Sequence, residues 1–137
     1  MMAIRRPQGN ALVLAVLRSQ AHRLLSGVAI ELRYVGRRSG RRFALPVQYA
    51  QDGARLVVVP QRATSSTWWR NFRSPQPVQV RLRGRLHDGV ARVVEPDDPQ
   101  WDRDRARYMA RWRRLAGSTD GPLVTITIGQ STTPRRP

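Results

Sequence analysis

Six short runs of this chain alternate apolar and polar residues, and this alternation limits the possible folds more than any other feature. The runs span residues 30–34, 43–49, 55–59, 78–82, 86–94 and 123–128. Alternation with a period of two is typical of β-strands that bury one face. The first three runs lie too close together for the crossover helices that parallel strands need. We therefore expect a mostly antiparallel sheet and exclude a doubly wound parallel one.

Helical patterns occur before and between these runs. A first helix is predicted from Asn10, a typical capping residue, to about Leu25. A short aromatic helix is predicted at 67–72, and a longer one at 98–117, where Asp-Pro gives a strong start signal. Six strands joined mostly by tight turns, with helices packed outside them, indicate an α+β antiparallel barrel.

Length and charge narrow the class of protein. The chain has 137 residues, a formal net charge of +16, and neither Cys nor Lys. Its length suits a single domain, expected over residues 10–128 with flexible ends at 1–9 and 129–137. The longest apolar run, 11–17, is much shorter than the ~20 residues of a transmembrane helix. We expect a cytoplasmic protein; the alternative adds peripheral contact with the anionic inner face of the membrane.

Several kinds of catalytic site are excluded by composition. Without Cys there is no thiolate metal site or Cys nucleophile, and without Lys there is no Schiff-base chemistry. No Gly-x-Gly-x-x-Gly motif is present, which argues against a common dinucleotide fold. His22 and His87 each stand alone, and the aspartates within 97–104 suit the start of a helix. We predict no metal site.

One segment is rich in groups that bind anions. Residues 36–42 read Gly-Arg-Arg-Ser-Gly-Arg-Arg and lie between two predicted strands. Glycine lets the backbone turn and expose its N–H groups, and guanidinium forks match phosphate or carboxylate groups. A second polar loop carries Arg62 and Thr-Ser-Ser-Thr at 64–67, directly before Trp68. These loops predict a site for an anionic ligand; the alternative is a solvated hairpin loop on a basic protein.

Two motifs in series support the first interpretation. They comprise Leu-Arg-Tyr-Val-Gly-Arg-Arg-Ser-Gly at 32–40 with Pro46-Val47 and the Asp52-Gly53 turn, and then Trp-Trp-Arg-Asn-Phe at 68–72 with Pro75 and Val-Gln-Val at 78–80. Together they resemble the deazaflavin-dependent nitroreductase family, which is related to flavin-binding pyridoxamine-phosphate-oxidase-like enzymes. The resemblance covers roughly residues 29–86. It implies a six-stranded, mostly antiparallel split β-barrel of the FMN-binding split-barrel type.

The resemblance also implies an enzyme. Its members would transfer a hydride from the reduced deazaflavin coenzyme F420 to a small organic acceptor, such as a quinone-like compound, an enone or a nitroaromatic. The phosphate and oligoglutamate tail of this coenzyme are anionic and suit the Arg-rich loop. The backbone at Pro46 and Val47 would lie near the ring system. The cofactor-binding positions implied in this way are Arg37, Arg38, Ser39, Gly40, Arg41, Pro46, Val47, Arg62, Trp68 and Asn71.

Two positions depart from the family pattern. Phe43 stands where the family usually has an Arg, and Gln48 stands where it has a Tyr. One alternative is therefore an FMN- or tetrapyrrole-binding protein of the same fold. Another is a basic, non-enzymatic binder of anionic membrane or nucleic acid; nucleic acid is disfavoured because the arginines are spread over strands and helices. We expect a monomer or a homodimer.

One aromatic residue is a candidate for contact with the acceptor. Tyr108 lies one helical turn before Trp112, and the resemblance implies that aromatic residues from this region cover the cofactor. We assign Tyr108 as the catalytic candidate, because its ring could stack on an acceptor while its hydroxyl donates a hydrogen bond. The alternative is that Trp101, Tyr108 and Trp112 form the stripe that packs this helix on the barrel.

Overall fold

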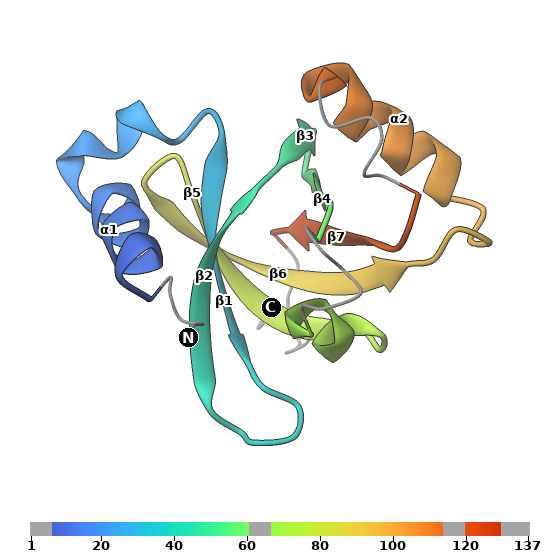
Figure 1. Cartoon of the computed structure of the whole chain (residues 1–137), viewed down its shortest axis with the longest axis horizontal. Coiled ribbons are helices and arrows are strands. Elements are labelled where there is room, and N and C mark those ends of the chain that lie inside the picture. Colours follow the sequence, from blue (N-terminus) through green and yellow to red (C-terminus); the bar gives the residue numbers. More distant parts are fainter. Residues whose placement is uncertain (1–6, 61–66, 114–119, 130–137) are drawn as a thin grey trace, which may run out of the picture.

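Seven strands form one sheet in the computed structural model, which describes residues 7–60, 67–113 and 120–129 (Figure 1). The strands are β1 (Ala29–Val35), β2 (Arg42–Gln48), β3 (Ala50–Asp52), β4 (Arg55–Val58), β5 (Gln76–Leu82), β6 (Arg85–Val94) and β7 (Leu123–Ile128). Their order is β2-β1-β5-β6-β7-β4-β3, and all neighbours pair in antiparallel fashion. The predicted antiparallel arrangement is confirmed.

The predicted number of strands, six, is wrong because a further short strand, β3, follows the run at 43–49. β2 ends at Gln48, and after Tyr49 the chain enters β3, which pairs with β4 across the predicted turn at Gly53 (φ +62°). The hydroxyl of Tyr49 donates a hydrogen bond to the carbonyl of Ser26 (2.6 Å) and anchors this crossing. Because β2 and β3 follow each other in sequence yet lie at opposite ends of the strand order, the sheet curls into a split barrel.

Helices lie beside this curled sheet (Figure 1), and the described ones are α1 (Pro7–Arg18), the 3₁₀ helices η2 (Gln20–Leu24) and η3 (Trp68–Phe72), and α2 (Trp101–Arg111). The first helix, predicted to be continuous, divides at Ser19. The Ser19 hydroxyl donates to the carbonyl of Val16 (2.8 Å) and accepts from the N–H of Ala21 (3.0 Å). A serine bonded to nearby backbone favours a helix end over a helix interior. The last helix, predicted at 98–117, is shorter than expected: α2 begins at Trp101 and ends at Arg111, because the backbone leaves the helical conformation at Trp112. The predicted end near Gly117 lies outside the described residues.

Two apolar clusters fill the space between these elements. The larger one lies inside the barrel and includes Ile30, Leu32 and Tyr34, the alternate residues of β1, together with Trp69 and Phe72 of η3. The smaller one lies between α2 and the strands β3, β4 and β7. Its buried members are Ala50, Val57, Val59, Val94, Tyr108 and Leu123, with Trp101 and Trp112 partly buried against them.

A buried carboxylate ties α1 to the sheet. Glu31 of β1 has no exposed surface, and its oxygens accept hydrogen bonds from Arg18 of α1 (2.6 Å at the shortest) and Arg81 of β5 (3.0 Å). Burial alone would raise the pKa of Glu31, but the hydrogen bonds and charges of the two arginines outweigh burial and hold that pKa below its ordinary value. Similarly, buried Asp104 of α2 accepts a bidentate pair of hydrogen bonds from Arg55 of β4 (3.0 and 2.9 Å).

Tyr108 lies in the smaller cluster and not at the surface. Its side chain is fully buried, and burial raises the pKa of its hydroxyl to about 12. Within the described residues, that hydroxyl has no hydrogen-bond partner. A ring enclosed by core residues offers no face to an acceptor, so this position supports the core alternative for Tyr108 and not contact with a substrate.

Replacing Tyr108 by Phe is expected to stabilise the protein. The change removes a buried hydroxyl without a partner, which costs about 1–3 kcal/mol, and keeps the ring. Thermal unfolding should therefore occur at a higher temperature in Tyr108→Phe than in the wild type. Tyr49→Phe is the matched control: it deletes a hydroxyl that is bonded to Ser26 and should lower the melting temperature. Equal losses of stability in the two variants would contradict this account.

The Glu31 cluster predicts how stability depends on pH. A lowered carboxyl pKa contributes stability that is complete above the unfolded-state value, about 4.3 for Glu, and is lost as the pH falls through the folded-state value. The free energy of unfolding of Glu31→Gln should lie about 3 kcal/mol below that of the wild type at pH 7, because two arginines lose their charged partner. This difference in the free energy of unfolding between wild type and Glu31→Gln should become smaller at acidic pH.

Urea unfolding at a series of pH values would measure both effects. Asp97→Asn, which neutralises an exposed carboxylate, is the control and should remain within about 0.5 kcal/mol of the wild type at pH 7. A gap between wild type and Glu31→Gln that stays constant down to pH 3 would show that the charge of Glu31 is not what stabilises the fold.

Candidate functional site

A cavity of about 350 Å³ lies between the β1–β2 loop and η3. The loop contributes Gly36, Arg37, Arg38 and Ser39, and the η3 segment contributes Thr67, Arg70, Asn71 and Arg73. Two segments separated by about thirty positions in sequence thus form its two walls. The cavity lies where the first sequence motif meets the second.

The loop owes its shape to hydrogen bonds among its own residues. The N–H of Gly36 donates to the carbonyl of Arg41 (2.8 Å), and the N–H of Gly40 donates to the carbonyl of Gly36 (2.9 Å). Gly40 has a φ of +71°, which L-residues with a side chain rarely adopt. The Ser39 hydroxyl accepts from the N–H of Arg41 (3.1 Å). The loop is therefore a closed turn that holds Arg37 and Arg38 at its tip.

Asn71 joins this loop to η3. Its side-chain oxygen accepts a hydrogen bond from the N–H of Arg37 (2.7 Å), and its side-chain nitrogen donates to the carbonyl of Trp68 (2.8 Å). The side-chain amide of Asn71 thus forms one hydrogen bond with each wall of the cavity. Asn71 fixes the spacing of the two walls as well as lining the space between them.

The cavity is strongly electropositive. Among the described residues that line it, four are arginines and none is Asp or Glu. Within the described part of the chain, Arg37, Arg38, Arg70 and Arg73 form no ion pair and donate no side-chain hydrogen bond. The guanidinium groups of Arg70 and Arg73 lie over the ring of Trp69, at 5.5 and 5.3 Å from its centroid, which holds them beside the cavity.

Backbone donors add to the positive potential. Among the described residues, the N–H groups of Arg38 and Ser39 have no hydrogen-bond partner. Backbone N–H groups that converge at a turn form a concave site for an anion. Four unpaired guanidinium groups and two unpaired N–H groups around one cavity are suited to a phosphate or to several carboxylates.

The structure brings together some of the predicted site residues. Arg37, Arg38, Ser39 and Asn71 line this cavity, whereas Gly40, Arg41, Pro46, Val47 and Trp68 lie in adjoining segments and do not. Val47 points into the larger core, and Trp68 packs edge-on against Phe72 (centroids 6.2 Å apart). Arg62 lies outside the described residues. Tyr108, buried under α2, is not part of this cavity.

Arg70 and Arg73 line the cavity but are not among the predicted site residues, although the motif at 68–72 contains Arg70. A 3₁₀ helix has three residues per turn, so residues three apart lie on the same side. Arg70 and Arg73 have this spacing, and both face the cavity. Interpreting 68–72 as a 3₁₀ helix with an arginine at its end would have identified them.

None of the helices in the described part of the chain is long and apolar enough to cross a membrane. No group of three or more metal-ligating side chains occurs in the same part of the chain.

Solved structures with a similar fold include redox and haem proteins. An F420-H2 dependent reductase (FDR-A) is 16% identical, with a TM-score of 0.53 over 72% of this chain and 92% of its own. The haem storage protein HutZ of Vibrio cholerae is 16% identical, with a TM-score of 0.53 over 83% and 92%. A protein described as a domain-swapped dimer is also 16% identical, with a TM-score of 0.54 over 82% and 98%. These similarities establish the split-barrel fold.

Comparison at the level of sequence establishes the family. No curated protein sequence matches the chain significantly. The family model described as F420H(2)-dependent quinone reductase matches residues 15–131, which is most of the chain and includes both walls of the cavity. This match confirms the predicted class of enzyme, a deazaflavin-dependent reductase, and its predicted cofactor, coenzyme F420. The chain belongs to the F420H(2)-dependent quinone reductase family.

Proposed function

We propose that this protein transfers a hydride from reduced coenzyme F420 to a quinone-type acceptor, and that the arginine-lined cavity holds the anionic end of the cofactor. One observation carries the assignment of the site: the four arginines that line the cavity have no acidic partner among the described residues. The phosphate and glutamate carboxylates of F420 would supply the missing negative charges. The residues present therefore fit this cofactor.

Each wall of the cavity has a distinct task in this proposal. Arg37 and Arg38, at the tip of the loop, bind the phosphate with their guanidinium forks, and the N–H of Ser39 adds a donor. Arg70 and Arg73, held against Trp69, bind carboxylates from the opposite wall. Asn71 keeps the walls at the correct distance. Positioning of this kind contributes to catalysis without any covalent step by the protein.

The free edge of the sheet is the proposed location of the ring system. β2 is the first strand in the order and has one hydrogen-bonded neighbour, β1. Pro46 has no N–H and is tolerated in a strand of this kind when that position faces away from the neighbour. The backbone groups of β2 that point the same way as Pro46 are then free to contact a ligand. When bound, the reduced deazaflavin supplies the hydride.

The protein is expected to oxidise reduced F420 in the presence of a soluble quinone such as menadione. The reaction can be followed by the return of the absorbance of the oxidised cofactor. Titration of the intrinsic Trp fluorescence should show that F420 binds more tightly than FMN, because FMN lacks the glutamate carboxylates that Arg70 and Arg73 would bind. Equal or tighter binding of FMN would favour the flavin alternative. Binding of F420 without turnover of any quinone would overturn the proposed acceptor alone.

Arg38→Ala is expected to weaken F420 binding by about 1.5–3 kcal/mol, as for the loss of a charged hydrogen bond. The melting temperature should hardly change, because Arg38 is exposed and has no ion pair among the described residues. Arg73→Ala should show a similar loss of affinity. Arg103→Ala, at an exposed position on α2, is the control for general loss of positive charge and should bind F420 normally. If Arg38→Ala melts several degrees lower and binds F420 normally, Arg38 is a structural residue.

A further inference from the structure

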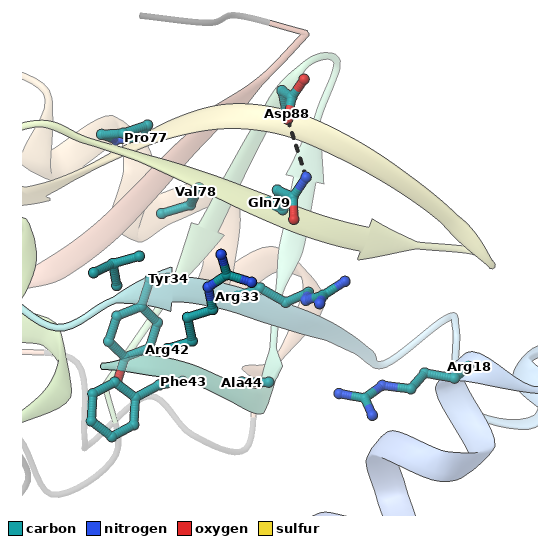
Figure 2. A pocket seen from close by; sticks show the side chains of 11 residues that line it. Arg18, Arg33, Tyr34, Arg42, Phe43, Ala44, Pro77, Val78, Gln79 and Asp88 are labelled. Carbon is teal, nitrogen blue, oxygen red and sulfur yellow. Dashed lines mark hydrogen bonds between the residues drawn. The ribbon is translucent and has the colours of Figure 1, made fainter. Parts of the chain in front are cut away.

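A second and larger cavity, of about 480 Å³, lies on another face of the sheet and shares no lining residue with the first. Three arginines from three elements line it: Arg18 of α1, Arg33 of β1 and Arg42 of β2. Gln79 of β5 and Asp88 of β6 form the opposite side. Figure 2 shows the guanidinium groups of Arg33 and Arg42 near each other, with Arg18 approaching from the helix.

Strand register explains why these side chains share one face. Arg33 pairs with Ala44 on one side and with Gln79 on the other, and Val35 pairs with Arg42. Paired residues project to the same side of a sheet, and successive residues to opposite sides. The rings of Tyr34 and Phe43 accordingly project to the other side in Figure 2, where they stack with centroids 5.4 Å apart.

The charge on this face is not balanced. Both oxygens of the neighbouring Glu31 already accept hydrogen bonds from Arg18 and Arg81. Arg33 forms an ion pair with Glu31 at 3.8 Å, which is beyond hydrogen-bond distance. Arg42 has neither an ion pair nor a hydrogen bond of its side chain among the described residues. The guanidinium group of Arg42 is therefore unpaired in this part of the chain, and the N–H donors of the Arg33 guanidinium make no hydrogen bond there.

The remainder of the lining selects the kind of anion. Val35, Ala44 and Pro77 provide an apolar surface beside the two arginines. Asp88 opposes them, and among the described residues its carboxylate accepts one hydrogen bond, a long one from Gln79 (3.5 Å). A carboxylate next to the site disfavours a ligand with a second negative charge. The volume is in the range of cavities that bind ligands of one or a few rings.

We propose that this cavity binds an aromatic monocarboxylate. The carboxylate of the ligand accepts hydrogen bonds from Arg33 and Arg42, and its ring lies on Val35, Ala44 and Pro77. Asp88 excludes dicarboxylates of the same shape. The cavity shares no lining residue with the arginine-lined cavity proposed for the anionic end of F420, and it adjoins β2, the proposed location of the ring system.

Calorimetric titration of the full-length protein with 2-naphthoate tests the proposal. The neutral analogue 2-naphthalenemethanol should bind at least tenfold more weakly, because it lacks the charge that Arg33 and Arg42 recognise. Arg42→Gln should reduce naphthoate affinity at least tenfold. This variant is expected to fold, because the Arg42 side chain is exposed and forms no ion pair or hydrogen bond with any described residue. Arg103→Ala and Arg38→Ala should bind naphthoate like the wild type.

A second titration tests the role of Asp88. Wild-type protein should bind 2,6-naphthalenedicarboxylate more weakly than 2-naphthoate, and Asp88→Asn should remove most of that difference. Equal binding of the acid and the alcohol would overturn the proposal. So would a loss of naphthoate affinity in Arg38→Ala instead of Arg42→Gln, which would place the ligand in the first cavity. F420 binding that is lost in Arg38→Ala while naphthoate binding persists would show that the two sites are independent.

Discussion

Buried carboxylates held by arginines are the interaction on which the rest of this structure depends. The chain has 25 basic residues and nine acidic ones, so most arginines repel one another. Glu31 and Asp104 are two of the few acidic residues inside the protein, and each ties one α-helix to the sheet. Removing either carboxylate would leave the half-buried Arg81 or Arg55 without its charged partner. Arg37, Arg38 and Arg42, by contrast, are exposed around the two cavities and have no ion pair among the described residues.

Much of the fold could be predicted because most strands follow one rule, the alternation of apolar and polar residues. Alternation in β1, β5 and β6 corresponds to residues that point into and out of the barrel. The same rule failed at Tyr49, which continues the alternation but belongs to the crossing from one end of the sheet to the other. It is the hydrogen bond to Ser26, a contact between distant segments, that holds this crossing. The break at Ser19 is likewise decided by hydrogen bonds that the hydrophobic pattern does not reveal.

Part of the candidate site could likewise be predicted from the sequence, and part could not. The density of donors in one short loop predicts Arg37, Arg38 and Ser39 as a group, and the structure places Asn71 against them. Arg70 and Arg73 were missed because their common side depends on the three-residue repeat of η3. The prediction for Tyr108 rested on the position of aromatic residues along a helix. Such a pattern suits packing and ligand contact equally well, and only the neighbours of Tyr108 show that this ring is in the core.

The close packing of Gly36 against the ring of Phe43 limits which side chains position 36 can carry. A Cβ added at Gly36 would lie 2.7 Å from the ring of Phe43, which itself stacks on Tyr34. The aromatic ring at position 43 and the absence of a side chain at position 36 therefore depend on each other. A chain that keeps the ring at 43 can accept alanine or serine at 36 only if this partly exposed ring shifts, and the Ser39 hydroxyl, 3.0 Å from the same Cβ, would also have to give way. The backbone of the anion-binding loop at Gly36 is thus constrained by the ring of Phe43, which stacks on Tyr34.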